Sequence, residues 1–531
     1  MQRTLHLQTS PHIASHAPLL AEEIRAHLSL KKDSALQYKI LKRSIDARGR
    51  SIRINLRILV AVDEELPRED FSLNYQDVSS SKRTCHIIGA GPGGLFAALR
   101  CLELGIKPIV IERGKDVRGR RRDLTAIHKE HRVNPESNYC FGEGGAGTYS
   151  DGKLYTRSNK RGDIKKILKT LVAHGASEDI LVDTHPHIGT NKLPQLIQNI
   201  RKTILQYGGE ILFNTKFIDF QSRGHTIDCI TIENETNTKE MPITHLILAT
   251  GHSARDIYEL LHSKHILVEA KPFAVGVRVE HPQELIDHIQ YHCRTLADVH
   301  SARQYLPAAS YSLTQQIPGR GVYSFCMCPG GIIAPCATAQ QEVVTNGWSP
   351  SKRNNPYANS GIVVGLELGD FEPFKEHGPL AGLEFQKTLE NQSWILGGQS
   401  QVAPAQRLTD FMTGKISSSL PSCSYQPGIR SVDMHQMLTP MISEALQAGF
   451  QAFGDKMRGY LSHEAVVVGV ESRTSTPVRI PRDQKHLHHP QVLNLFPCGE
   501  GAGYAGGIMS AAMDGERCAN SLKYENWHRA R

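Results

Sequence analysis

The segment from Cys85 to Glu112 constrains this chain more than any other part of its sequence. A short apolar strand leads into a Gly-Ala-Gly-Pro-Gly-Gly turn, an Ala/Leu-rich helix follows, and a second apolar strand ends at Glu112. In this pattern Gly89 permits a tight turn, Gly91 lets the backbone approach a pyrophosphate, and Gly94 lets helix and strand pack closely. The helix N-terminus favours the pyrophosphate, and Glu112 stands where an acid accepts ribose hydroxyls. The spacing predicts a dinucleotide-binding Rossmann unit.

A second glycine-rich turn, near the end of the chain, indicates which dinucleotide is bound. Residues 493–515 have the pattern of a strand, a turn with five glycines and a small-residue helix. FAD needs one site for its adenylate half and another for ribityl and flavin, whereas simple nicotinamide dehydrogenases do not need the second site. Glu500 is a candidate acceptor for a ribityl hydroxyl. Gly506 and Gly507 would bring a helix N-terminus to the flavin, where the helix dipole stabilises negative charge. A plain helix cap is the alternative interpretation.

A third element lies between these two turns in the sequence. Residues 244–254 form an apolar run that ends in Ala-Thr250-Gly251. The run resembles the strand that closes the FAD domain in glutathione-reductase-like flavoproteins. Three elements in this order predict non-covalent FAD as the cofactor.

Longer motifs make the resemblance specific. From about Tyr38 to the C-terminus the chain resembles the uncharacterised FAD-dependent dehydrogenases often labelled NAD(FAD)-utilising dehydrogenases. The resemblance implies a fold and a cofactor without a substrate. The motifs that carry it are Gly142–Leu154, Lys271–His281, Phe325–Gly331, Glu471–Ile480 and Gly499–Gly507.

These patterns and the resemblance together give a set of candidate site residues. Three are candidates for catalysis: Arg473 for clamping a carboxylate or stabilising reduced flavin, His281 as a proton donor, and Lys153 beside the flavin. A structural ion pair of Arg473 with Glu471 or Asp483, and an ordinary histidine at 281, are the alternatives. The candidate cofactor-binding residues are Gly89, Gly91, Pro92, Gly94, Glu112, Arg113, Gly144, Gly145, Ser150, Gly152, Lys153, Thr250, Gly251, Gly499, Glu500, Gly506, Gly507 and Ile508.

Cys326-Met-Cys328 is the most conspicuous thiol pair. A dithiol beside a flavin could exchange electrons with it, but disulfide oxidoreductases use wider spacings, and a C-x-C ring is strained. Two small apolar residues entering the turn at Pro329 are the favoured interpretation. No cysteine set has metal-ligand spacing, and the histidines from His486 to His489 precede a proline in a polar turn, where we expect them at the surface. No metal is therefore predicted.

Composition fits a large cytoplasmic protein. The 531 residues predict two or three domains with ample core. No run of 18 apolar residues occurs, so no membrane association is predicted. The first residues lack the apolar region of a secretory signal, and eleven unpaired cysteines suit a reducing compartment.

Two segments are strongly basic. Residues 31–57 carry nine Lys or Arg against two acids, and residues 113–132 carry eight against three. An RNA-binding hypothesis follows, since some FAD enzymes act on tRNA. Residues 31–57 contain one aromatic, Tyr38, so stacking platforms for bases are missing. Solvated strand faces, or contacts to cofactor phosphates and an acidic substrate, explain the charge better, and nucleic acid is not the expected partner.

The elements predict an α/β protein with three domains. Residues 1–80 give a β-α-β-β pattern, with strands near 4–7, 38–46 and 52–60 and a helix over 19–28, which indicates a small ferredoxin-like domain. A serine-rich linker over 70–82 follows. Residues 81–270 and 460–531 form a discontinuous glutathione-reductase-like, Rossmann-like FAD domain. Residues 271–459 form an inserted, mixed α+β substrate domain.

The predicted function is that of an FAD-dependent oxidoreductase acting on a small molecule. One complete Rossmann fingerprint leaves no dedicated NAD(P) domain, so NAD(P)H would bind transiently in the substrate cleft. A flavin-bearing RNA-modifying enzyme and a flavin-binding redox sensor without turnover are the alternatives. The sequence indicates no oligomeric state.

Overall fold

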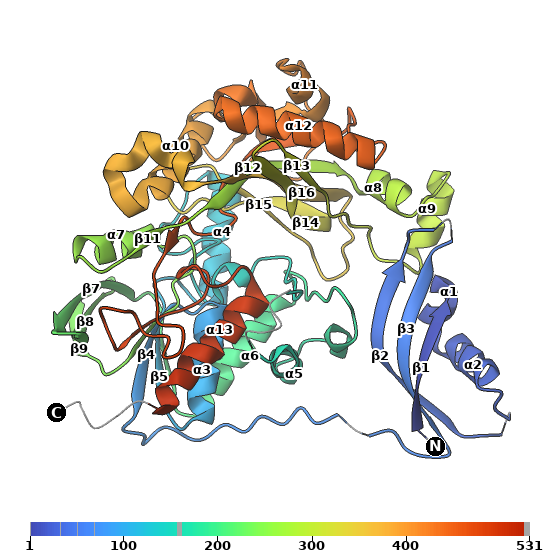
Figure 1. Ribbon diagram of the computed structural model, residues 1–531, viewed down its shortest axis with the longest axis horizontal. Helices are drawn as coiled ribbons and strands as arrows, with labels where there is room; N and C mark the ends of the chain where they lie inside the picture. The colour runs from blue at the N-terminus through green and yellow to red at the C-terminus, as the bar shows by residue number, and fades with distance from the viewer. Residues whose placement is uncertain (1, 32, 50, 68, 157–161, 525–531) are drawn as a thin grey trace.

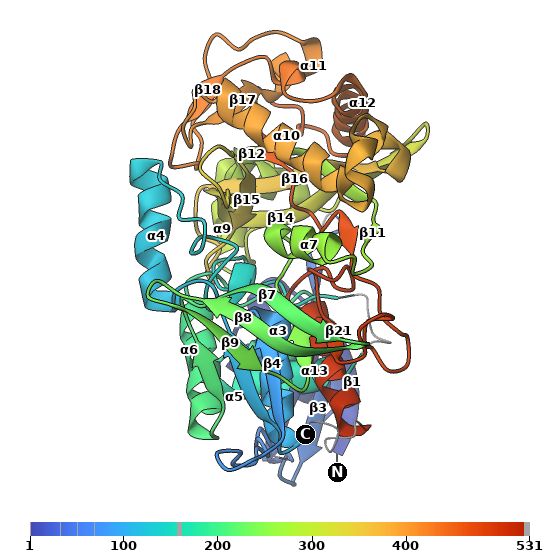
Figure 2. The ribbon, with the colours of Figure 1, turned by 90° about the vertical axis from the view of Figure 1, so that its left-hand side faces the viewer.

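The computed structural model describes residues 2–31, 33–49, 51–67, 69–156 and 162–524. Three regions, each built around its own main sheet, make up the chain (Figure 1). A small N-terminal sheet lies at one side, a parallel sheet with its helices lies in the lower part, and a large mixed sheet lies above it. A view turned by 90° shows that the large sheet stacks over the parallel-sheet region (Figure 2). In the described part of the chain, no helix has the length and apolar character needed to cross a membrane.

The N-terminal region has the strands and the helix that its apolar pattern predicts. Its antiparallel sheet has the order β1-β3-β2, so β3 lies between β1 and β2, the split β-α-β arrangement of ferredoxin-like folds. The second helix and fourth strand of that fold do not occur in the described residues before 84, so the prediction holds for the first half only. The elements are β1 (Gln2–Thr9), α1 (Pro11–Ser15), α2 (Ala17–His27), β2 (Leu36–Asp46) and β3 (Arg53–Val62).

This region is joined to the rest by an extended connection and by a shared core. The described residues between 63 and 83 form no helix or strand, as predicted for a linker, and Figure 1 shows them running along the base of the molecule. The linker still packs, because the Val78 amide donates to Tyr207 O at 2.9 Å. Leu20 and Ile58 belong to the same buried apolar cluster as the large sheet. The N-terminal region is therefore docked onto its neighbour.

The second region is a five-stranded sheet in which every neighbouring pair is parallel. Its strands lie in the spatial order β21-β10-β4-β5-β6, and apolar runs in the sequence predicted β4, β5, β10 and β21. Since the carboxyl ends of parallel strands share one edge, the turns that follow β4, β10 and β21 lie side by side there. The strands are β4 (Thr84–Ile88), β5 (Lys107–Ile111), β6 (Glu210–Leu212), β10 (Leu246–Leu248) and β21 (Leu495–Pro497).

Two glycine-bearing helices pack against this sheet and against each other. α3 (Pro92–Glu103) follows β4, and α13 (Ile508–Ser521) follows β21. A Cβ on Gly94 would lie 1.9 Å from Gly89 O, and one on Gly515 would lie 2.0 Å from Gly93 O. The predicted role of Gly94 in close helix–strand packing is thus confirmed.

The apolar periodicity did not predict the three-stranded antiparallel meander between β6 and β10. The meander has the order β7-β8-β9. Its core comes from alternating residues such as Phe217, Phe220 and Ile230, all buried. The strands are β7 (Lys216–Arg223), β8 (Thr226–Glu233) and β9 (Thr238–Pro242).

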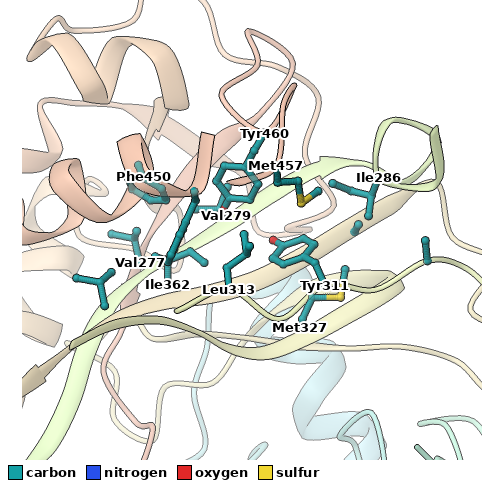
Figure 3. Close-up of a cluster of buried hydrophobic side chains, with 14 of the residues drawn as sticks. Val277, Val279, Ile286, Tyr311, Leu313, Met327, Ile362, Phe450, Met457 and Tyr460 are labelled. Carbon is teal, nitrogen blue, oxygen red and sulfur yellow. The ribbon is translucent and has the colours of Figure 1, made fainter. Parts of the chain in front are cut away.

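The third region is an eight-stranded mixed sheet with the order β13-β14-β16-β12-β19-β17-β18, and β15 pairs with β14. Its core under α12 includes Val277, Ile362, Phe450 and Tyr460 (Figure 3). The sequence assigned residues after 459 to the FAD domain, but β19 pairs with β12 and β17 inside this sheet. The insertion therefore extends past 459. The apolar run at 466–470 did not reveal this, because such a run fits a sheet covered on both faces as well as a parallel one.

Among the residues that the structure describes, the third region contains eight strands and five α-helices. Its strands are β12 (Phe273–Pro282), β13 (Thr314–Ile317), β14 (Arg320–Pro335), β15 (Thr345–Trp348), β16 (Tyr357–Leu366), β17 (Ala403–Arg407), β18 (Ile429–Ser431) and β19 (Val466–Glu471). Its helices are α8 (Gln283–Gln290), α9 (Leu296–Arg303), α10 (Ala381–Leu396), α11 (Leu408–Thr413) and α12 (Pro440–Lys456). Elsewhere lie α4 (Val117–Glu130), α5 (Ile164–Ala173), α6 (Leu193–Gln206), α7 (Arg255–Ser263), β11 (Glu269–Ala270) and β20 (Val478–Arg479).

Candidate functional site

A cleft with a cavity volume of about 390 Å³ lies where the carboxyl edge of the parallel sheet faces the large sheet. The turns after β4, β10 and β21 line one side, and Phe325, Cys326 and Asn346 of the large sheet line the other. All but two of the predicted cofactor-binding residues line this cleft. The exceptions are Gly94, which packs behind it, and Gly144, where a Cβ would lie 1.8 Å from Thr148 Oγ1.

The turn after β4 has the geometry that its glycines predict. Gly89 has φ of 100°, and a Cβ there would lie 2.4 Å from Ala249 O. Gly91 is the N-cap of α3 and has no side-chain cap. The nearest protein atom to a Cβ on Gly91 is Gly145 Cα at 3.9 Å, so the space beside Gly91 belongs to the cleft. Free amides at a helix N-terminus facing an open space are a suitable site for a pyrophosphate.

Glu112 ties three backbone segments together, a role that the sequence did not predict. Its side chain is 4% exposed. Its carboxylate accepts N–H groups from Ala90 at 2.8 Å and from Gly114 and Gly142 at 2.9 Å each. Two of these bonds end on Oε1 and one on Oε2, which leaves Oε2 with acceptor capacity for a ribose hydroxyl.

Arg113 lines the cleft, but its guanidinium is held by the protein. Its Nε lies 2.5 Å from Glu136 Oε2, and its Nη1 lies 2.9 Å from Asp256 Oδ1. The guanidinium also lies 4.3 Å from the centre of the Phe141 ring. We therefore expect Arg113 to shape the adenylate end of the cleft by packing.

The turns after β10 and β21 form the other end of the cleft. Thr250 Oγ1 is buried and lacks a hydrogen-bond partner within the described chain. A Cβ added to Gly251, Gly506 or Gly507 would meet no protein atom within 4 Å. Glu500 accepts the Gly507 amide, and burial raises the pKa of Glu500 to about 7. The Thr250 hydroxyl, without a partner among the described residues, and the open space beside the three glycines fit a bound dinucleotide.

His281 is not part of the cleft, so its predicted role as a proton donor is wrong. It is fully buried on β12, and its Nε2 lies 2.8 Å from Tyr460 O. Burial lowers its pKa to about 4. The strand alternation of β12 directs His281 into the core beside the Tyr460 ring.

Arg473 borders the cleft, as predicted, but belongs to a buried ion network. Its Nη2 lies 2.7 Å from Glu342 Oε2 and 2.8 Å from Glu390 Oε2. Arg255 pairs with the same two carboxylates at 2.6 and 2.7 Å. The predicted alternative of a structural ion pair is therefore closer to the structure, although the partners are not Glu471 or Asp483. Neighbouring Arg255 and Arg473 hold the pKa of Glu390 at about 2 despite its burial.

His252 is a cleft residue to which the sequence assigned no role. Its Nδ1 lies 2.8 Å from Ser253 Oγ, and its Nε2 lies 4.0 Å from Glu500 Oε2. Burial, followed by the charge of Arg473, lowers its pKa to about 4. The signal that could have identified it is its position directly after the Thr-Gly pair.

Lys153 lies in the cleft with two thiols that the sequence treated as packing residues. Its Nζ is 3.6 Å from both Cys326 Sγ and Cys328 Sγ, and 3.4 Å from Asp151 Oδ2. Arg278, fully buried, donates from Nη2 to Cys326 O at 2.9 Å. No spacing rule links these residues, since they come from three separate segments: one loop, β12 and β14.

Two other sets of residues contain side chains of the types that bind metals: a Cys-Asp-Cys cluster and a histidine run. Within the described residues, Cys498, Asp514 and Cys518 have ligand atoms close together, but Arg482 Nη2 pairs with Asp514 at 2.6 Å and supplies the positive charge. The His486–His489 run was expected at the surface, yet His489 is buried and its Nε2 lies 3.0 Å from Leu267 O.

Comparisons with known proteins agree with this geometry. An uncharacterised protein from Clostridium beijerinckii is 38% identical over 523 residues, and the match covers 95% of each chain. The family described as FAD-dependent protein, C-terminal domain-like, matches residues 272–474, and a domain family of unknown function matches residues 1–61. The first match contains β12 to β19, which are the eight described strands of the large sheet.

Similar solved structures are distant. A flavoprotein/dehydrogenase from Cytophaga hutchinsonii is 12% identical with a TM-score of 0.35, covering 84% of this chain and 81% of that one. A flavin-dependent brominase is 12% identical with a TM-score of 0.36, covering 84% and 81%. These values transfer no reaction to this protein. The chain belongs to the same family as the Clostridium beijerinckii protein, a family of FAD-dependent proteins, and its cofactor is FAD.

Proposed function

We propose that the protein is an FAD-dependent oxidoreductase that transfers a hydride or electrons between non-covalent FAD and a small-molecule substrate. One observation carries the proposal: three strand ends from distant parts of the sequence meet in a single cleft and present open glycine backbone to it. Bound FAD supplies the hydride and electron chemistry that amino-acid side chains lack. A glutathione-reductase-like arrangement, with the large sheet as substrate domain, belongs to the same proposal.

The parallel sheet supplies the residues that hold the cofactor. The α3 N-terminus at Gly91 binds the pyrophosphate, and Glu112 Oε2 accepts a ribose hydroxyl. Gly506 and Gly507 bring the α13 N-terminus to the flavin end, where its amides stabilise negative charge. Glu500 orients this turn through the Gly507 amide.

The large sheet supplies the substrate side of the cleft. Phe325, Asn346 and Trp348 line it and exclude water from part of its wall. Lys153 adds a positive charge there, which suits an anionic substrate group or a developing anion. Since one Rossmann unit is used for FAD, a nicotinamide donor would enter this same side transiently.

The basic N-terminal segment does not favour the RNA-modifying alternative. Arg43 Nε lies 2.7 Å from Asp183 Oδ1, and Lys39 Nζ lies 3.1 Å from Glu69 Oε1. Part of the positive charge is therefore used within the protein. Lys32 and Arg50 of this segment lie outside the described residues.

Replacement of Gly91 tests the cofactor site. In Gly91→Val the new side chain occupies the pyrophosphate position, while its Cβ meets no protein atom closer than 3.9 Å. We expect a protein that melts close to wild type but loses its yellow colour and its FAD. Gly369→Val is the matched control, because a Cβ there meets nothing within 4 Å outside the cleft. Undiminished FAD content in Gly91→Val would refute the assignment of this turn.

The reaction class is tested by anaerobic addition of reductants to the holoprotein, followed by flavin absorbance. Bleaching by NADH, NADPH or a small organic donor, with reoxidation by a second reactant, is the expected result. A flavin unreactive toward every reductant would favour the redox sensor. Bulk RNA that co-purifies with salt-dependent affinity would favour the RNA-modifying enzyme.

A further inference from the structure

Cys326 and Cys328 are positioned by an irregularity in β14. The pairing register of β14 with β16 shifts between Phe325 and Cys328, and Cys326 has φ of 47°. β-Bulges re-aim side chains, and non-glycine residues with positive φ concentrate at functional sites. On an extended strand the two cysteines would be poorly placed for a disulfide, because Cα atoms two residues apart are about 6.6–6.8 Å apart, at the upper limit for that bond. The premise of an extended strand does not hold at Cys326.

Met327 fixes the direction of the two thiols. Its side chain is buried in the apolar core with Tyr311 and Leu313, as Figure 3 shows. The sulfur atoms on either side of it both approach Lys153 Nζ. The Cys328 thiol donates to the backbone carbonyl oxygen of Cys326 at 3.2 Å. Of the two cysteines, Cys326 lines the cleft, and Cys328 is fully buried behind it.

Charged groups around the pair favour one thiolate. Interaction with the neighbouring Cys328 side chain, followed by the charges of Lys153 and Arg278, holds the pKa of Cys326 well below its usual range. Burial, followed by the interaction with Cys326, raises the pKa of Cys328. The pair therefore carries one negative charge and one proton near neutral pH, with the charge on the sulfur that faces the cleft.

The acidic groups nearby do not cancel this effect. Asp151 is ionised, but it is shared between Lys153 and Arg353, at 3.4 and 3.6 Å. Burial raises the pKa of Glu471, beside Arg278, to about 8. Glu500, across the cleft, has a raised pKa as described above. His187 is neutral, because burial lowers its pKa to about 4. The cations next to Cys326 are Lys153, at its sulfur, and Arg278, at its carbonyl oxygen, and both favour a thiolate there.

We propose that Cys326 and Cys328 form a redox-active dithiol in the cleft, in which the Cys326 thiolate attacks a small disulfide and Cys328 resolves the product. In the first step the Cys326 sulfur bonds to one sulfur of R–S–S–R′, the substrate S–S bond breaks and R′S⁻ leaves. In the second, Cys328 gives its proton to R′S⁻ and attacks the Cys326 sulfur, and RS⁻ leaves. The pair loses two electrons, and the substrate gains them as one thiol and one thiolate.

Lys153 acts here as a positioning residue. Its ammonium contacts both sulfurs, so it stabilises the Cys326 thiolate and each departing thiolate. Arg278 donates to the Cys326 carbonyl oxygen, so its guanidinium adds a second positive charge near the thiolate. The proposal goes beyond the proposed function, since thiol exchange with a disulfide does not require a reducible flavin.

Mass spectrometry of the reduced holoprotein tests the pair, with glutathione disulfide as the probe. After exposure and acid quench, the wild-type peptide that carries both cysteines should be two hydrogens lighter. Tandem fragmentation is needed because the same tryptic peptide, residues 321–352, contains Cys336. Cys328→Ser should retain glutathione on position 326, and Cys326→Ser should show neither product. Cys140→Ser is the matched control: Cys140 lines the same cleft, but its sulfur accepts from Ser253 Oγ at 3.3 Å. It should behave as wild type.

The pH dependence of Cys326 alkylation by iodoacetamide separates a positioned thiolate from a packed thiol. We expect a wild-type midpoint well below about 8.5, the value of an ordinary cysteine. Lys153→Met should raise the midpoint by about one unit, and Lys153→Arg should restore it. A midpoint near 8.5 in wild type, or Cys328→Ser without a glutathione adduct, would overturn the proposal. Both readouts are obtained whether or not the flavin reacts, so this failure differs from failure of the oxidoreductase assignment.

Discussion

Removal of the Glu112 carboxylate should weaken both the apo fold and FAD binding. In the structure the buried carboxylate accepts three backbone N–H groups, at 2.8 to 2.9 Å, from the turns at Ala90, Gly114 and Gly142. Hydrogen bonds to a charged group contribute about 1.5–3 kcal/mol each, and the contributions of neighbouring bonds are not additive. Glu112→Ala leaves three buried donors unpaired. We expect it to lower the free energy of unfolding by roughly 3–5 kcal/mol.

The effect on FAD is separate and smaller. Loss of one ribose hydrogen bond to a carboxylate should cost about 1.5–3 kcal/mol, which is roughly a 10- to 150-fold weaker FAD affinity. Urea unfolding of the apoprotein measures the first quantity. FAD titration followed by flavin fluorescence, under conditions where the variant is folded, measures the second. Glu112→Gln serves as the isosteric control, since it keeps one acceptor oxygen.

Two results would refute this reasoning. Wild-type unfolding free energy in Glu112→Ala would mean that the three amides find other partners. A destabilised variant that binds FAD as tightly as wild type would mean that Glu112 holds the turns without touching the ribose.

Two further predictions concern packing and acid stability. Gly94→Ala should lower the melting temperature and reduce FAD content, because its Cβ would lie 1.9 Å from Gly89 O; unchanged melting relative to Gly369→Ala would contradict the close helix–strand packing. The folded-state pKa of Glu390, about 2, lies below its ordinary value of 4.5, so its ionised form stabilises the fold above about pH 4.5, and this stability is lost as the pH falls toward 2. Urea unfolding between pH 5 and 3 should show a steeper loss for wild type than for Glu390→Gln, and equal slopes would show that the Arg255–Arg473 network does not hold this carboxylate.

The parallel-sheet half of the site could be predicted because its signals are local. Gly89, Gly91 and Gly507 stand at turns between apolar strands and helices, and such turns fix both the backbone conformation and the side of the sheet. Strand adjacency is not local, yet the glycine turns after β4 and β21 and the Thr-Gly pair after β10 imply a shared edge once a parallel sheet is assumed. All three lie there.

Most of the opposite wall could not be predicted, because it is assembled by the tertiary structure. Lys153 was predicted beside the flavin, but its neighbours Arg278 and Cys326 come from two strands that no spacing rule connects to it. His281 was misassigned since a histidine after an apolar strand has the same sequence pattern in a core and in a cleft. β19 was misassigned because its apolar run, residues 466–470, fits either sheet.

Backbone irregularity was also invisible in the sequence. The left-handed conformation at Cys326 has no glycine to signal it, and it changes which way the thiols point. The partners of Arg473 lie more than 80 positions earlier in the chain, at Glu342 and Glu390, whereas the sequence suggested near neighbours.

A crystal structure of the yellow holoprotein would test the central claim most directly. We expect density for FAD along the cleft, with adenosine at Glu112, pyrophosphate at the α3 N-terminus and the flavin between the α13 N-terminus and Lys153. Density for a retained small molecule would lie on the Phe325 and Asn346 side. Stoichiometric flavin bound elsewhere, or a flavin end turned away from Cys326, would contradict the account.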